Sequence, residues 1–205
     1  TIGENGDILI SGGEINIKAK KDGNVLVISN VITAELPAAA IDNGMQLFSG
    51  GRGSNGEFQW VTLKDSSSYI EYMSTAPIKY LAHFLPDTMG WINCDRFYNN
   101  PGPKTNVEIT VANNPSLSNT VMFFIFKDIN SVTRIYKNTS GEIFSLGPNY
   151  RIPVGMEVTL LAFTLKDGKM YWKKEDLTIT QDMTKTIELK ETTEANLLAE
   201  IKAFQ

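Results

Sequence analysis

The stretch EINIKAKKDGNVLVI, residues 14–28, decides the fold class of this chain. Ile15 and Ile17 alternate with polar side chains, which is the pattern of a β-strand with one buried face. The pair Asp22-Gly23 follows, and this pair is typical of the two-residue turn of a β-hairpin. The apolar run after the turn resumes a strand, so the stretch predicts a hairpin.

The same pattern recurs along the chain. A second hairpin signal consists of MEVTLLAFTL, the pair Asp167-Gly168 and KMYW, at residues 156–172. The nearly continuous apolar run TVMFFIF, residues 120–126, is typical of a central strand buried on both faces. Segments of this kind are separated by Gly, Asn, Asp or Pro. The sequence therefore predicts a mainly β protein, with two antiparallel β-sandwich-like units and one C-terminal α-helix.

A chain of 205 residues suits one large or two small domains. We expect two units, residues 1–86 and residues 87–205, with the boundary in the turn-rich segment at residues 86–90. Residues 91–97 have the composition of a strand, and we assign them to the second unit because that unit needs a first strand. NNPGPK, residues 99–104, is then a loop within the second unit.

The helix is expected after Thr193, which can cap it. Leu197, Leu198, Ile201 and Phe204 recur at a spacing of three and four and form an apolar stripe. The stripe has two alternative interpretations: it packs on the sheet of its own unit, which we favour, or it contacts a partner protein.

Charge and composition exclude several function classes. The formal net charge is −4, and the 19 Lys and Arg residues are scattered among 23 Asp and Glu residues. No basic block is present, so we expect neither nucleic acid nor an anionic membrane as a partner. The longest apolar stretch, residues 121–126, is too short to span a bilayer. The chain begins TIGENG, without Met, and we expect a processed N-terminus from which targeting information has been removed.

The single cysteine lies in GWINCDRFYN, residues 90–99, and the single histidine is His83. A nucleophilic cysteine needs a base, but no helix N-terminus is predicted after Cys94 and His83 lies in an apolar strand-like segment. We therefore expect Cys94 to be a buried core residue that shares a strand face with Ile92. One Cys and one His do not make a zinc site. We expect no catalytic residues and no cofactor, and only a calcium ion bound by loop oxygens stays open.

Aromatic residues provide the remaining candidate site. Tyr171 and Trp172 lie next to a predicted hairpin and beside two lysines, and they are the pair that we expect to be exposed. Exposed aromatics stack on sugars, whereas buried ones fill a sandwich core. For the tryptophans and tyrosines as a group we favour the core. The candidate ligand or partner contacts are Tyr171, Trp172, Leu197, Ile201 and Phe204.

Four segments carry a resemblance to a known group of proteins. LISGGEINIKAKKDGNVLVI, ITAELPA, GMQLFSG and FQW follow one another in this order, and GWINCDRF comes after them. Together they resemble a ZU5-like β block of Bacteroidota envelope proteins and lipoproteins, with Met89 where that group commonly has Leu. The block normally has strands before the Gly12-Gly13 pair, so we expect the first unit to be truncated or completed by the second. The second half looks like a carboxypeptidase-regulatory, transthyretin-like β-sandwich.

The resemblance implies a location and a function class. The location is the periplasm or the cell surface, with a lipid anchor on a removed N-terminal segment. The implied function is that of a non-catalytic interaction or structural module, with an envelope protein as the expected partner. The alternative is a carbohydrate-binding module that uses exposed aromatics and binds a glycan.

Overall fold

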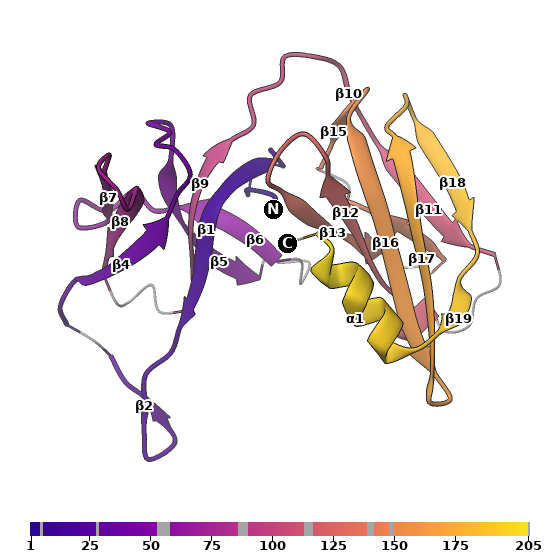
Figure 1. The fold of residues 1–205 in the computed structure, drawn as a ribbon, viewed down its shortest axis with the longest axis horizontal. Helices are drawn as coiled ribbons and strands as arrows, with labels where there is room; N and C mark the ends of the chain where they lie inside the picture. The colour runs from indigo at the N-terminus through magenta and orange to yellow at the C-terminus, as the bar shows by residue number, and fades with distance from the viewer. Residues whose placement is uncertain are drawn as a thin grey trace. The chain divides into compact units, whose positions relative to one another are not determined.

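The computed structural model describes residues 1–4, 6–27, 29–52, 58–85, 90–112, 117–138, 142–147 and 150–204, with the backbone alone at residue 117. Strands make up most of the described chain, and the expectation of a mainly β protein is confirmed. The chain divides into two compact units, Thr1–Asn99 and Asn100–Gln205 (Figure 1).

The first unit contains two antiparallel sheets that pack face to face. One has four strands in the order β1-β9-β5-β6, and the other has three in the order β4-β8-β7. Alternate residues of both sheets point into a shared apolar core, as expected for a sandwich. The strands are β1 (Leu9–Ile17), β9 (Gly90–Phe97), β5 (Gln46–Arg52), β6 (Phe58–Thr62), β4 (Ile32–Pro37), β8 (Lys79–Phe84) and β7 (Tyr69–Met73).

Strand β9 is central in the first unit, and this corrects one expectation. Residues 86–89, where the boundary was expected, lie outside the described residues. Residues 91–97 were assigned to the second unit, but β9 pairs with β1 on one side and with β5 on the other. Because an inner strand of a sheet belongs to the core of that sheet, the first unit extends to Asn99.

The second unit is built on one eight-stranded sheet that curls. Its order is β18-β11-β14-β13-β12-β16-β17-β19, and β11 and β18 are the only described neighbours in it that run parallel. The bend lies at β13, whose first residues pair with β12 and whose last two pair with β14. The strands are β18 (Met183–Ile187), β11 (Val107–Val111), β14 (Ile143–Ser145), β13 (Val132–Lys137), β12 (Val121–Phe126), β16 (Glu157–Lys166), β17 (Lys169–Thr178) and β19 (Lys190–Thr192).

Short elements complete this unit. β10 (Lys104–Thr105) pairs with β15 (Ile152–Pro153), and a 3-10 turn, η2, covers Leu117–Asn119. The apolar run predicted as a central strand is β12, which lies between β13 and β16. Its residues Met122, Phe124 and Phe126 are buried, whereas the alternate ones are partly covered.

The C-terminal helix forms as the sequence predicts. Helix α1 covers Glu194–Lys202, and the Thr193 hydroxyl accepts a hydrogen bond from the Asn196 N–H at 3.2 Å. This contact satisfies one of the amides that every helix leaves unpaired in its first turn. Lys174 of β17 pairs with Glu200 of the helix at 2.8 Å, so the helix lies against the sheet of its own unit (Figure 1).

Both predicted hairpins exist, but they differ in length. Asp22 and Gly23 have φ angles of 51° and 82°, and Asp167 and Gly168 have 51° and 75°, as a tight turn of matching twist requires. The second turn joins β16 and β17, which pair over ten residues each. The first joins β2 (Lys20–Lys21) and β3 (Asn24–Val25), which pair over two residues each.

Candidate functional site

Cys94 lies in the core of the first unit. It is fully buried on β9, as expected for a small apolar side chain. The same core cluster contains Ile92 of β9, Leu47 of β5 and Tyr80 of β8. Burial raises the pKa of the Cys94 thiol from 9.0 to about 12. The thiolate is the reactive form of cysteine, so this thiol is inert near neutral pH.

His83 points away from this core. On β8 the alternate residues Tyr80, Ala82 and Phe84 are buried in the core, so His83 faces the opposite side of the three-stranded sheet. There its ring stacks on Tyr69 with centroids 4.5 Å apart, and Nδ1 lies 2.9 Å from the Thr33 hydroxyl. Cys94 therefore lies in the core between the two sheets, whereas His83 lies on the outer face of the three-stranded sheet. The two side chains do not form a catalytic pair.

Two polar side chains are buried beside Cys94 on the other face of β9. The Asn93 amide donates to the Asp95 carboxyl at 2.6 Å, and both residues are fully buried. Burial is the main cause that raises the pKa of Asp95 from 3.8 to about 7. The Ser11 side chain and the Gly12 backbone hydrogen-bond this carboxyl and oppose the shift. The pair is a buried polar part of the sheet, with no described neighbour that makes it a catalytic site.

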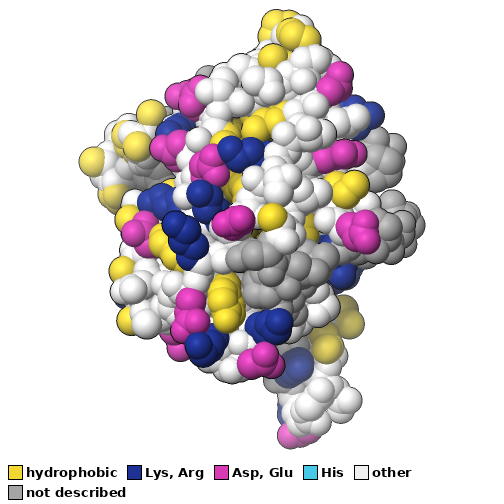
Figure 2. All heavy atoms as spheres, turned by 90° about the vertical axis from the view of Figure 1, so that its right-hand side faces the viewer, with side chains coloured by type: hydrophobic (Ala, Val, Ile, Leu, Met, Phe, Trp, Pro, Cys, Tyr) yellow, Lys and Arg dark blue, Asp and Glu magenta, His cyan; other side chains and the backbone are white. Residues whose placement is uncertain are grey.

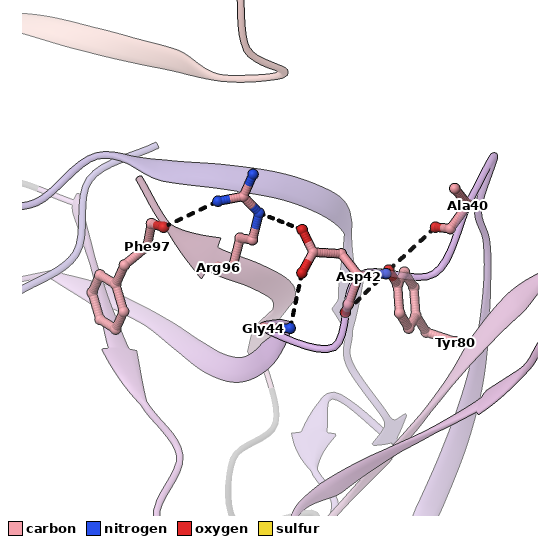
Figure 3. Close-up of polar contacts among 6 residues, drawn as sticks. All are labelled: Ala40, Asp42, Gly44, Tyr80, Arg96 and Phe97. Atoms are coloured by element: carbon pink, nitrogen blue, oxygen red, sulfur yellow. Dashed lines mark hydrogen bonds and ion pairs between the residues drawn. The ribbon is translucent and has the colours of Figure 1, made fainter. Parts of the chain in front are cut away.

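A second polar network joins the β4–β5 connection to the sheets of the first unit (Figure 3). The Asp42 carboxylate accepts from the Gly44 N–H at 2.9 Å and forms an ion pair with Arg96 Nε at 2.5 Å. The Tyr80 hydroxyl accepts from the Asp42 N–H at 2.6 Å. The sequence did not predict this network, because its only local signal is the turn sequence Asp42-Asn43-Gly44. Arg96 and Tyr80, which Asp42 contacts, lie on strands far away in the chain. The contacts of the network fix a loop against two strands of the first unit.

The described ranges contain neither a cluster of metal ligands nor a membrane-spanning helix. In them, no three His, Cys, Asp or Glu side chains gather as ligands for a metal ion. No helix among them has the length and hydrophobicity needed to cross a bilayer.

Tyr171 and Trp172 do not form one exposed aromatic surface. They are consecutive on β17, so their side chains point to opposite faces of the sheet. Each is half-buried, with Tyr171 opposite Thr164 and Trp172 opposite Phe163 on β16. A stacking site for a sugar ring needs aromatics on a common face, and this pair does not supply one.

The apolar stripe of the helix is only partly available to a partner. Leu197 is buried, with 3% of its surface exposed, whereas 48% of Leu198 is exposed. Ile201 is half-buried, and the Phe204 ring lies 4.7 Å from the Lys174 ammonium in a cation–π contact. The unit thus covers Leu197 and part of Ile201, whereas Leu198 and Phe204, which is 37% exposed, remain accessible.

The most exposed apolar segment of the described chain lies between β1 and β4. We call residues 18–31 the arm; it carries the β2–β3 hairpin and projects from the sheets of the first unit (Figure 1). The exposed fractions are 67% for Val25, 40% for Leu26, 87% for Val27 and 46% for Val31. Every described residue from 20 to 31 is exposed, so this part of the arm contributes nothing to the core.

Charge divides the arm into two parts. Lys18 precedes β2, Lys20 and Lys21 form it and Asp22 lies in the turn, whereas residues 24–34 contain no charged side chain. The second unit presents a different surface, because Figure 2 shows Lys, Arg, Asp and Glu side chains intermingled on the face that it displays. On β17, for example, Lys173 and Glu175 lie 3.3 Å apart. A mixed-charge surface of this kind is typical of solvated sheet faces.

Comparisons with known proteins give no further guide. A scan against protein-family models finds no match to this chain, and a search of curated proteins finds none.

Proposed function

We propose that this chain is a non-catalytic interaction module of the cell envelope, and that the arm is its contact element. The exposure of the arm carries the proposal: an apolar segment of several residues stands in solvent on a folded unit. Such segments mark interaction sites more often than single exposed hydrophobic residues do. The envelope location rests on the resemblance of residues 9–98 to Bacteroidota envelope proteins.

The sequence of the arm supports a binding role. Valine and leucine are apolar residues that favour buried strand positions, yet Leu26, Val27 and Val31 lie outside every described strand. A local preference that the fold does not satisfy is typical of a functional segment. We infer that the arm completes its β structure on a partner.

Cysteine labelling in cells tests this function. The variant Val27→Cys places an exposed thiol on the arm, and the native Cys94 is buried and stays silent. Val132→Cys on β13 is the matched control, because Val132 is also exposed, at 46%, but lies in a strand with neighbours on both sides.

If the arm contacts a partner, a maleimide should label the Val27→Cys variant rapidly in dilute purified protein. In the cells that make the protein, the labelling should be several-fold slower. The Val132→Cys variant should label at a similar rate in both settings. Equal protection of the two introduced thiols, or no protection of the thiol on the arm, contradicts an interaction through the arm.

A further inference from the structure

We propose that the partner of the arm is the arm of a second copy of this chain, and that the two arms pair as antiparallel strands in a symmetric dimer. This inference rests on the proposed function and names the partner. It depends on the arm alone and not on how the two units of the chain are arranged.

The first argument is the unsatisfied strand preference. β3 ends at Val25, the Leu26 N–H still donates to the Ala19 carbonyl at 2.9 Å, and the described residues beyond it belong to no ladder before β4 begins. Residues outside a ladder offer N–H and C=O groups that another strand can bind. The run is long enough for a short ladder and too short to form a sheet by itself.

The second argument is the absence of charge. Proteins protect their exposed strand edges with charged side chains, and β4, β7 and β18, which lie at the edges of their sheets, follow that rule. Glu35 lies on β4, Glu71 on β7 and Lys185 on β18. Residues 24–34 contain no such side chain. Because like charges opposite one another oppose pairing, an uncharged segment is suited to pair with its own copy.

The third argument is symmetry. Two antiparallel strands of the same sequence are related by a two-fold axis, so one segment provides both sides of the contact. The pairing closes with two copies and needs no second binding surface. A ladder of a few residues gives a weak association, so the dimer fraction should depend strongly on concentration.

The decisive experiment measures mass across a concentration series. Sedimentation velocity or light scattering of the purified chain should show the weight-average mass rising from 22.7 kDa toward twice that value. Val27→Lys places like charges in the paired segment and should keep the protein monomeric over the same range. Val132→Lys, the same change on an exposed strand residue outside the arm, should dimerise like the parent.

Three results overturn the proposal. They are a parent protein that stays monomeric at every concentration, equal loss of dimer in both variants, and a mass that grows past the dimer into open-ended aggregates. If Val27→Lys unfolds at the same urea concentration as the parent, misfolding is excluded as the cause of its monomeric state.

The outcomes also separate this inference from the proposed function. A monomeric parent whose Val27→Cys variant is still protected from labelling in cells means that the arm binds a different molecule, so only the self-pairing fails. A monomeric parent without such protection means that both proposals fail.

Discussion

Two hairpins in this chain turn on the same Asp-Gly pair, β2–β3 at Asp22-Gly23 and β16–β17 at Asp167-Gly168. The φ angle is 51° at both aspartates. The β16–β17 ladder continues over ten residue pairs, whereas the β2–β3 ladder stops after two. The turn sequence therefore starts a hairpin but does not determine how far it extends.

The difference lies in what each hairpin packs against. β16 has buried residues on both faces, including Val158, Leu160 and Leu161, because neighbouring elements of its unit cover it. The valines of the arm have no described cover and remain in solvent. A two-stranded hairpin alone is at best marginally stable in water, so the arm keeps only the turn and the first pairs.

The largest expected effect separates the two hairpins by core truncation. Leu160→Ala removes a fully buried side chain from β16 and should lower the free energy of unfolding by about 2–5 kcal/mol. Val27→Ala in the arm should change it by less than about 0.5 kcal/mol, as exposed positions do. Urea unfolding of both variants measures the contrast, and similar losses would mean that the arm is part of a core.

The buried carboxyl of β9 gives a pH-dependent effect that the arm does not have. The pKa of Asp95 is raised to about 7 in the folded protein against 3.8 in the unfolded chain, so the folded state holds the proton over this interval. Stability should be greatest below pH 4 for this group and fall by on the order of 4 kcal/mol as pH rises through 7.

Asp95→Asn removes this titration and serves as the test. The variant should show a flatter dependence of the unfolding free energy on pH between 4 and 7 and should be more stable than the parent at pH 8. Urea midpoints at several pH values measure it. An unchanged slope in the variant would mean that Asp95 is ionised and solvated in the folded state.

A matched pair on the helix gives a smaller effect. Leu197→Ala should lower the free energy of unfolding by about 2 kcal/mol, because only 3% of this residue is exposed. Leu198→Ala should leave the free energy of unfolding nearly unchanged, because 48% of Leu198 is exposed. Deletion of residues 193–205 should lower the melting temperature by several degrees. Calorimetry measures all three proteins. Equal effects of the two leucine substitutions would show that the helix is not docked as described.

The smallest expected effect compares the two turns directly. Gly23 and Gly168 both have positive φ, and at neither would a Cβ meet an atom within 4 Å, so alanine strains only the backbone. Gly168→Ala should cost about 1 kcal/mol because the strained turn closes a long, buried ladder. Gly23→Ala should leave global stability unchanged, since the arm can unfold locally without cost to the core. Thermal unfolding of the two variants checks this, and equal losses would contradict it.

The contrast between the hairpins also explains how much the sequence could predict. Period-two alternation and Asp-Gly pairs located most strands, and the spacing of Leu197, Ile201 and Phe204 located the helix, because these are local signals. The place of β9 was missed, since strand pairing joins residues far apart in the chain. The Asp42–Arg96 network was missed for the same reason. Local pattern likewise predicted a strand after Asp22-Gly23 and gave no sign that nothing would cover it.

The central claim is that the arm completes its β structure by pairing with a second copy, and hydrogen exchange tests it most directly. In dilute solution, the amides of the described arm residues between 27 and 31 should exchange at nearly the rate of an unstructured chain, while those of residues 158–164 in β16 are protected. At high concentration the account predicts that protection appears at the same arm residues and stays unchanged in β16, and that Val27→Lys abolishes the new protection. Arm amides that exchange equally fast at every concentration, or that are already protected in dilute solution, would contradict it.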